Sequence, residues 1–203
     1  MLLDASYEIR GLEPVIILWG IDRENNPIAL LDKRFRPYFY ALLEKGVDDN
    51  SVNKIIQRIK ALSKPRSPIL EVKPVDKRYF GKPVKALLVK TLIPEYVREY
   101  REEVKKIPGV LDALEADIRF ALRYMVDKRL VPFEWYIVEA SEINDPSFRV
   151  KKVYLIESDP TSKGREPLPD FKIMAFDIEV YSKTGSPRPE VDPVIIISTQ
   201  TSD

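Results

Sequence analysis

The chain has 203 residues, of which 44% are hydrophobic and 32% charged, a balance that permits a buried core and excludes wholesale disorder. It has no cysteine and no histidine. That absence excludes disulfide scaffolds, zinc sites with thiolate or imidazole ligands, and catalysis by Cys or His. Any active site must therefore use carboxylates, Lys, Arg, Tyr or hydroxyl groups. No run approaches the roughly 20 apolar residues of a membrane span, and the first residues lack a basic leader, so we expect a cytoplasmic protein.

Charge is divided unevenly along the chain. Residues 1–132 hold 25 Lys and Arg against 19 Asp and Glu, a net charge of +6, whereas residues 133–203 hold 8 against 13, a net charge of −5. A basic first part indicates contact with nucleic acid, although solvated helix faces would give the same asymmetry. The high charged fraction and the presence of only two glutamines are also typical of thermophile proteins.

The first third of the chain predicts a β-meander followed by a helix. Apolar and β-branched runs at residues 5–10, 15–21 and 27–31 indicate strands separated by turn residues. Between residues 52 and 62, apolar side chains recur at helical spacing. The outer face of that helix is basic and consists of Lys54, Arg58 and Lys60.

The next elements predict an α+β layer. Strands are expected at residues 69–75 and 84–91, a helix from Pro94 to about residue 106, an extended segment at 109–117 and a short helix at 119–128. A meander followed by helix, strand, strand, helix and strand indicates an α+β fold. It contains a ferredoxin-like layer of the kind that RNA-recognition domains use.

From residue 133 the pattern changes to β-rich runs at 133–138 and 149–156, followed by a proline-bearing stretch at 158–170 that we interpret as a linker or exposed loop. Two strongly apolar strands, at 171–180 and 193–198, close the sequence.

Asp177 and Glu179 interrupt the first of these apolar strands. Side chains two apart on a strand point to the same side, so the two carboxylates converge. Oxygen ligands of this kind suit Mg²⁺, which can activate water for phosphodiester hydrolysis. A strand that runs out into solvent would carry the same pair without a function, but its apolar sequence is typical of a buried strand, where an unliganded acid is costly.

The segment Phe176-Asp177-Ile178-Glu179, followed by the apolar run at 193–198, resembles the first exonuclease motif of family-B DNA polymerases. Further motifs resemble the N-terminal domain of archaeal members, so that the resemblance covers nearly the whole chain and is weakest from Glu134 to Pro169. These motifs are Leu3-Asp4-Ala5-Ser6-Tyr7, Phe35-Arg36-Pro37-Tyr38-Phe39-Tyr40-Ala41-Leu42, Phe80-Gly81-Lys82-Pro83, Asp117-Ile118, Arg123-Tyr124-Met125-Val126-Asp127-Lys128 and Leu130-Val131-Pro132.

The resemblance implies a template-binding domain at residues 1–132 and the opening strands of an RNase H-like 3′ to 5′ exonuclease domain at 133–203, with a β-rich insertion at about 134–169. It implies template DNA, the rest of the polymerase chain and a sliding clamp as partners. In the complete protein, Asp177 and Glu179 would be catalytic residues and Mg²⁺ ligands. The further acidic motifs and polymerase modules of the family do not fit before residue 203, so we expect a truncated chain with no catalysis and no tightly bound metal.

The family also implies a pocket that captures uracil in the template strand. An everted base would be read by backbone amides near Tyr38 and Ile118, while a tight wall rejects the methyl group of thymine. Arg119 departs from the proline that is common at its position, which puts the local backbone in doubt. Without the resemblance, ordinary packing would explain the same side chains. The implied pocket residues are Tyr7, Pro37, Tyr38, Val97, Ile118, Phe120 and Arg123.

Template DNA would also account for the basic first part of the chain, with Tyr38 and Tyr40 able to stack on unpaired bases or on each other. Two alternatives remain open: an autonomous module that binds RNA or single-stranded DNA, and a small Mg²⁺-dependent nuclease. The candidate phosphate contacts are Arg34, Arg36, Lys54, Arg58 and Lys60.

Overall fold

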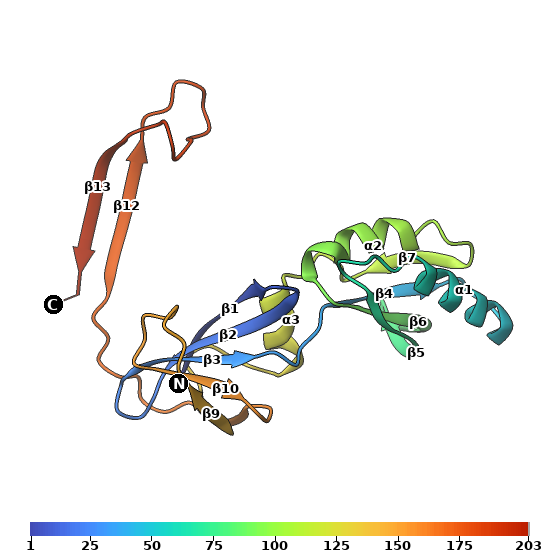
Figure 1. The fold of residues 1–203 in the computed structure, drawn as a ribbon, viewed down its shortest axis with the longest axis horizontal. Coiled ribbons are helices and arrows are strands. Elements are labelled where there is room, and N and C mark those ends of the chain that lie inside the picture. Colours follow the sequence, from blue (N-terminus) through green and yellow to red (C-terminus); the bar gives the residue numbers. More distant parts are fainter. Residues whose placement is uncertain (203) are drawn as a thin grey trace. The chain divides into compact units, whose positions relative to one another are not determined.

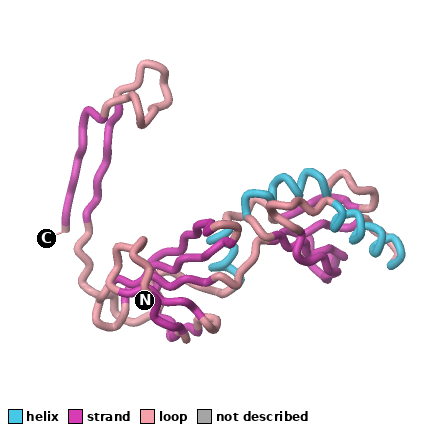
Figure 2. The backbone as a smooth tube through the Cα atoms, viewed as in Figure 1, coloured by secondary structure: helices cyan, strands magenta, loops and turns pink. Residues whose placement is uncertain are grey.

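The computed structural model describes residues 1–202, and Asp203 lies outside the described part. The chain forms two compact units, Met1–Glu166 and a second unit that begins at Pro167 (Figure 1). The three α-helices found in residues 1–202 all belong to the first unit, and strands make up most of the remaining regular structure (Figure 2).

The first sheet begins with the predicted meander, in which β1 (Leu2–Arg10), β2 (Glu13–Ile21) and β3 (Pro27–Asp32) pair antiparallel. Two later strands extend it: β10 (Lys152–Ile156) pairs parallel with β3, and β9 (Ala140–Ile143) pairs antiparallel with β10. The order in the sheet is therefore β1-β2-β3-β10-β9.

This extension makes the first compact unit run to Glu166. The physical reason is burial, because Val153 joins Val15, Ile17 and Leu31 in one apolar cluster on the sheet. The division into domains at residues 132 and 133 stays a prediction. The stretch expected to be a linker also contains a strand, β11 (Thr161–Gly164), which pairs with β8 (Trp135–Ile137).

The second sheet has the βαββαβ order of a ferredoxin-like layer, which confirms that part of the predicted fold. Its strands are antiparallel and lie in the order β5-β6-β4-β7. The elements are β4 (Tyr38–Leu43), α1 (Asp49–Ala61), β5 (Ile69–Tyr79), β6 (Lys82–Thr91), the 3₁₀ helix η1 (Pro94–Tyr96), α2 (Val97–Val104) and β7 (Val110–Leu114).

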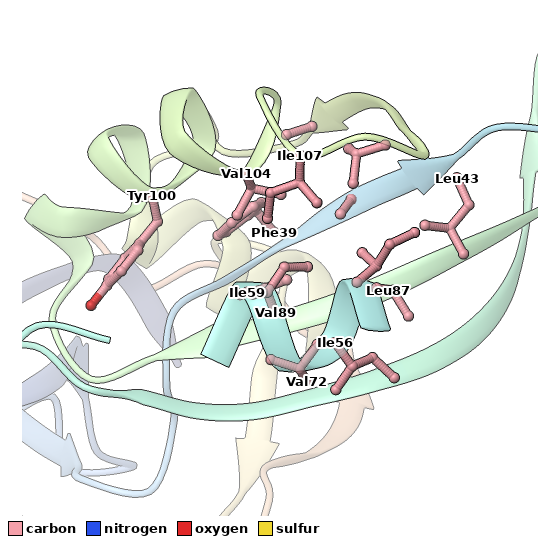
Figure 3. Packing of buried hydrophobic residues seen from close by; sticks show 14 of the residues in the cluster. Phe39, Leu43, Ile56, Ile59, Val72, Leu87, Val89, Tyr100, Val104 and Ile107 are labelled. Carbon is pink, nitrogen blue, oxygen red and sulfur yellow. The ribbon is translucent and has the colours of Figure 1, made fainter. Parts of the chain in front are cut away.

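Both helices of this layer cover the same face of the sheet (Figure 3). Ile59 of α1 and Tyr100 and Val104 of α2 pack with Phe39 and Leu87 of the strands, and all five side chains are fully buried. Burial of each such side chain contributes on the order of 1.5–3 kcal/mol, so this cluster fixes the helices on the sheet. The opposite face carries no helix of the layer.

Helix α3 (Phe120–Asp127) packs on β1 of the first sheet. Phe120 and Tyr124 lie in one cluster with Leu2 and Leu18. The Tyr124 hydroxyl donates a hydrogen bond of 2.9 Å to Oδ2 of Asp32, which is 1% exposed. The helix is thereby held at the end of β3, close to the segment that leads into β4.

Asp32 connects this cluster to Arg34, whose guanidinium lies 2.8 Å from Oδ2. Burial alone would raise the pKa of Asp32, but hydrogen bonds from Arg34 and Tyr124 outweigh burial and lower it. Because the folded pKa is depressed, the carboxylate stabilises the fold above the unfolded pKa of about 3.9, and this contribution disappears as the pH falls through the folded pKa.

We therefore expect Asp32→Asn to reduce the free energy of unfolding by about 2 kcal/mol at pH 7, because charge-assisted hydrogen bonds are lost. The difference between variant and wild type should shrink below about pH 4, where the wild-type carboxyl takes up a proton. Urea titrations across that pH range measure it, and a difference independent of pH would refute the ionised role of Asp32.

The second unit contains the antiparallel pair β12 (Met174–Val180) and β13 (Val194–Thr201). Phe176 is 66% and Ile178 is 47% exposed, which corrects the expectation of a buried strand. A two-stranded ribbon has no second layer against which to bury these side chains.

None of the helices in the described part of the chain is long and apolar enough to cross a membrane.

Candidate functional site

One open cavity of about 660 Å³ in the first unit is lined by all seven residues that the sequence assigned to a pocket. Tyr7 comes from β1, Pro37 directly precedes β4, Tyr38 begins β4, and Val97 begins α2; the other three lie between Ile118 and Arg123. Segments far apart in the chain meet here because α3 packs on β1 while β4 and α2 belong to the ferredoxin-like layer.

Aromatic rings form one wall of this cavity. The rings of Tyr7 and Phe120 meet edge to face with centroids 5.3 Å apart, and Phe35 stacks behind Phe120 at 5.4 Å. The Tyr7 hydroxyl donates to Oε1 of Glu95 at 3.3 Å. Burial and the Glu95 carboxylate raise the pKa of Tyr7, so its hydroxyl stays protonated as a donor at neutral pH.

Arg123 organises the neighbouring part of the lining. Its side chain is buried, and it donates to Oε2 of Glu115 at 2.6 Å and to the Glu115 carbonyl at 3.2 Å. Its guanidinium also lies over the Tyr38 ring, 4.6 Å from the centroid. Burial alone would lower the pKa of Arg123, but Glu115 outweighs burial and raises it. Arg123 therefore braces the pocket as a permanent cation.

The Tyr38 side chain is fixed from its other end by Asp127, whose Oδ2 accepts a hydrogen bond from the Tyr38 hydroxyl at 2.7 Å. Burial, followed by this hydrogen bond, raises the pKa of Tyr38. Glu115, which holds Arg123, has a left-handed backbone with φ of 63°. Sequence reasoning missed Glu115 and Asp127 as partners, since no periodic pattern joins either of them to the residue it holds.

Backbone donors also face the cavity. The carbonyl of Pro37 accepts from the N–H of Thr91 on β6. Hydrogen-bonding directions alternate along an antiparallel strand, so the N–H of Tyr38 points to the other side of β4, where β7 has already ended at Leu114. The start of α3, which lines the same cavity, has no side-chain N-cap hydrogen bond, although the first amides of a helix need partners.

Arg119 does not disturb this backbone. Its φ is −57°, within the range of about −65 ± 15° that a proline ring imposes. The carbonyl of Arg119 accepts from the N–H of Arg123 and so begins α3. The main chain at Arg119 therefore has a conformation that proline would also adopt.

Val97 and Ile118 differ in their exposure to solvent. Val97 is 6% exposed and lies in the core cluster of the ferredoxin-like layer as well as in the cavity wall. Ile118 is 38% exposed. Packing and pocket formation are therefore not alternatives at Val97, because one side chain contributes to both.

The predicted phosphate contacts fall into two groups. Arg34 is engaged by Asp32, by Asp159 at 3.2 Å and by the carbonyl of Glu157 at 2.7 Å, and Arg36 donates to the carbonyls of residues 33 and 35. Within residues 1–202 no salt bridge involves the three basic side chains of α1, which are exposed on its outer face. These are Lys54, Arg58 and Lys60.

Asp177 and Glu179 lie two residues apart on β12, opposite Ser198 and Ile196 of β13. The register places both on one face of the ribbon, as predicted. Across residues 1–202 no group of three or more acidic side chains is close enough to hold a metal ion. Two carboxylates alone are too few to fill the coordination shell of Mg²⁺.

A layer of this topology beside a pocket with aromatic walls and backbone donors is an architecture suited to binding single nucleic-acid strands. Comparisons with known proteins give the family. Residues 111–203 match the family model for the exonuclease domain of DNA polymerase family B. DNA polymerase 2 of Aeropyrum pernix is 46% identical over 98% of this chain, and the DNA polymerase of Archaeoglobus fulgidus is 32% identical over the whole of it.

A solved structure gives the same result: the family B DNA polymerase of the hyperthermophilic archaeon Pyrobaculum calidifontis covers 99% of this chain with a TM-score of 0.74 and 38% identity. The chain belongs to the family-B DNA polymerases and matches their N-terminal and exonuclease region. It spans about a quarter of the length of these relatives.

Proposed function

We propose that this region binds the single-stranded template of an archaeal family-B DNA polymerase and captures uracil ahead of synthesis. The observation that carries the proposal is the meeting of all seven implied pocket residues around one cavity. Its volume of about 660 Å³ lies within the roughly 300–1,000 Å³ of typical small-ligand sites.

Recognition would use the pairing edge of the everted base. The N–H of Tyr38 and the first amides of α3 face the carbonyl oxygens of uracil, and the Tyr7 and Phe120 rings pack against the base. Val97 and Pro37 narrow the cavity where the C5 methyl of thymine would lie. One methyl group in a tight apolar pocket discriminates by about ten- to a hundredfold.

For the whole protein we propose DNA-directed DNA synthesis with Mg²⁺-dependent 3′ to 5′ proofreading. Its partners are template DNA, the rest of the polymerase and a sliding clamp. Support comes from the names of the relatives and from the match to an exonuclease domain. Asp177 and Glu179 would hold part of the metal site, where Mg²⁺ would activate water for phosphodiester hydrolysis.

The test is a titration of the 203-residue chain with matched DNA oligonucleotides that bear uracil or thymine at one position. The proposal requires tighter binding of the uracil strand. Equal affinities in a folded sample would refute it. A matched RNA strand, bound at least as well as DNA, would instead favour an RNA-binding module.

The basic face of α1 gives a separate prediction. Replacing Lys54, Arg58 and Lys60 with Ala should weaken binding of uracil and thymine strands equally, because phosphate contacts carry no sequence information. The slope of log affinity against log salt concentration should become shallower by about 2, because each of three phosphate contacts on a single strand contributes about 0.7. A control that replaces Lys106, Arg129 and Arg149 removes the same charge elsewhere and should change the slope less; an equal change would refute a specific path over α1.

A further inference from the structure

The helix-free face of the ferredoxin-like layer contains a second cavity, of about 260 Å³. Its floor consists of apolar side chains of β4, β6 and β7, among them Leu42 and Ala86, and of the Tyr40 ring. Lys77, Arg78 and Tyr79 of β5 form its rim. The function proposed above makes no use of this cavity.

The second cavity adjoins the proposed uracil pocket. Asp117 and Ile118 line both. The rings of Tyr38 and Tyr40 also meet edge to face with centroids 5.5 Å apart, one in each cavity wall. A strand with one base in the first cavity would therefore pass directly over the second.

The rim of the second cavity offers cations that the protein does not neutralise. Within residues 1–202 neither Lys77 nor Arg78 forms a salt bridge, although Lys73 and Lys90 of the same hairpin both pair with Glu71. Nζ of Lys77 lies 4.4 Å from the centroid of the Tyr40 ring. Glu115, an acidic residue of the lining, is already paired with Arg123. Because side chains alternate along a strand, Lys77 faces the cavity and Arg78 points to the other side of the edge strand β5. Lys77 is therefore the cation placed to contact phosphate here.

Exposed aromatic rings stand at the tip of the same hairpin. Phe80 is 86% exposed, and its ring meets that of Tyr79 with centroids 4.6 Å apart. Phe80 and Gly81 both have positive φ, 47° and 76°, in a two-residue turn that favours Asn-Gly. A bulky residue in this conformation is strained and gains nothing from burial here, which is typical of a functional position.

We infer that the second cavity binds the deoxynucleotide next to the captured uracil, with its base stacked on Tyr79 and Phe80 and its phosphate contacted by Lys77. The inference rests on the proposed uracil capture and names where the adjoining nucleotide lies. Rings that stack on any base, together with cations that contact phosphate, select a single strand without regard to its sequence.

The experiment compares uracil-bearing DNA oligonucleotides whose neighbouring nucleotide, on the 5′ or on the 3′ side, is intact or abasic. Loss of a stacked base should lower wild-type affinity about tenfold on one of the two sides. Tyr79→Ala should lower affinity for the intact strand similarly and have no additional effect on that abasic strand. Additive effects, or no effect of either abasic site, would overturn the inference.

Two further variants separate binding from folding. Phe80→Asn should raise the melting temperature, because asparagine accepts the left-handed turn, while it weakens binding of the intact strand. Lys77→Ala should make the salt slope shallower by about 0.7, unlike the control Lys106→Ala. If the wild type shows no preference for uracil, both proposals fail. A preference for uracil without coupling between Tyr79 and the neighbouring base overturns only the inference about the second cavity.

Discussion

Val97→Gln is expected to abolish the preference for uracil over thymine while leaving salt-dependent affinity for the strand nearly unchanged. Val97 lies at the start of α2 and faces the cavity, so the longer side chain would occupy the volume of the base. A ratio of about ten- to a hundredfold should fall to about one. Titrations with matched uracil and thymine oligonucleotides measure the ratio.

Because Val97 also belongs to the core, its variant needs a control for folding. Val97→Thr keeps the shape of the side chain and the volume of the cavity, so it should retain the preference despite some loss of stability. Persistence of the preference in Val97→Gln would show that the base binds elsewhere. Loss of strand affinity together with the preference would make Val97 a core residue only.

Arg123→Met is expected to lower the free energy of unfolding by about 2 kcal/mol and also to remove the preference for uracil. Breaking a buried ion pair costs roughly 3–5 kcal/mol, and the smaller value applies because Glu115 is 45% exposed and can be solvated. Without Arg123, the Glu115 loop loses two hydrogen bonds and the Tyr38 ring loses its cation–π contact. Chemical denaturation and the same titrations measure the two effects.

Arg66→Met provides the matched control, because Arg66 is exposed in a turn and its substitution should change stability by no more than about 0.5 kcal/mol. Arg123→Lys keeps the charge but not the pair of hydrogen bonds, so it should fall between wild type and Arg123→Met. A stable Arg123→Met variant that still prefers uracil would contradict the bracing role.

Local pattern was enough to predict the elements of the ferredoxin-like layer except its first strand, β4, which was not predicted as a strand. Its helices alternate apolar and charged positions with the period of an α-helix, so that Ile55 and Ile59 are buried whereas Arg58 is exposed, and each strand is bounded by turn residues. The pocket was different: Tyr7 and Phe120 lie far apart in the sequence, and only the resemblance to a family joined them before the fold placed their rings in contact.

Long-range pairing was beyond the reach of the sequence. The alternating side chains of β10 predicted a strand, but nothing local indicates that it pairs in parallel with β3 across more than a hundred residues. The exposure of Phe176 was missed for the opposite reason, because an apolar strand reads as buried even where the described chain supplies no layer to cover it. Ion-pair partners such as Glu115 depend on loop geometry, which periodicity does not encode.

The most direct test of uracil capture is to follow the backbone amide resonances of the isotopically labelled chain during addition of a uracil or a thymine oligonucleotide. If uracil is captured as proposed, the amides of Tyr38, Ile118 and Ala121 shift strongly with the uracil strand and weakly with the thymine strand at equal saturation. Equal shifts with both strands, or uracil-dependent shifts confined to residues outside the cavity, would contradict it.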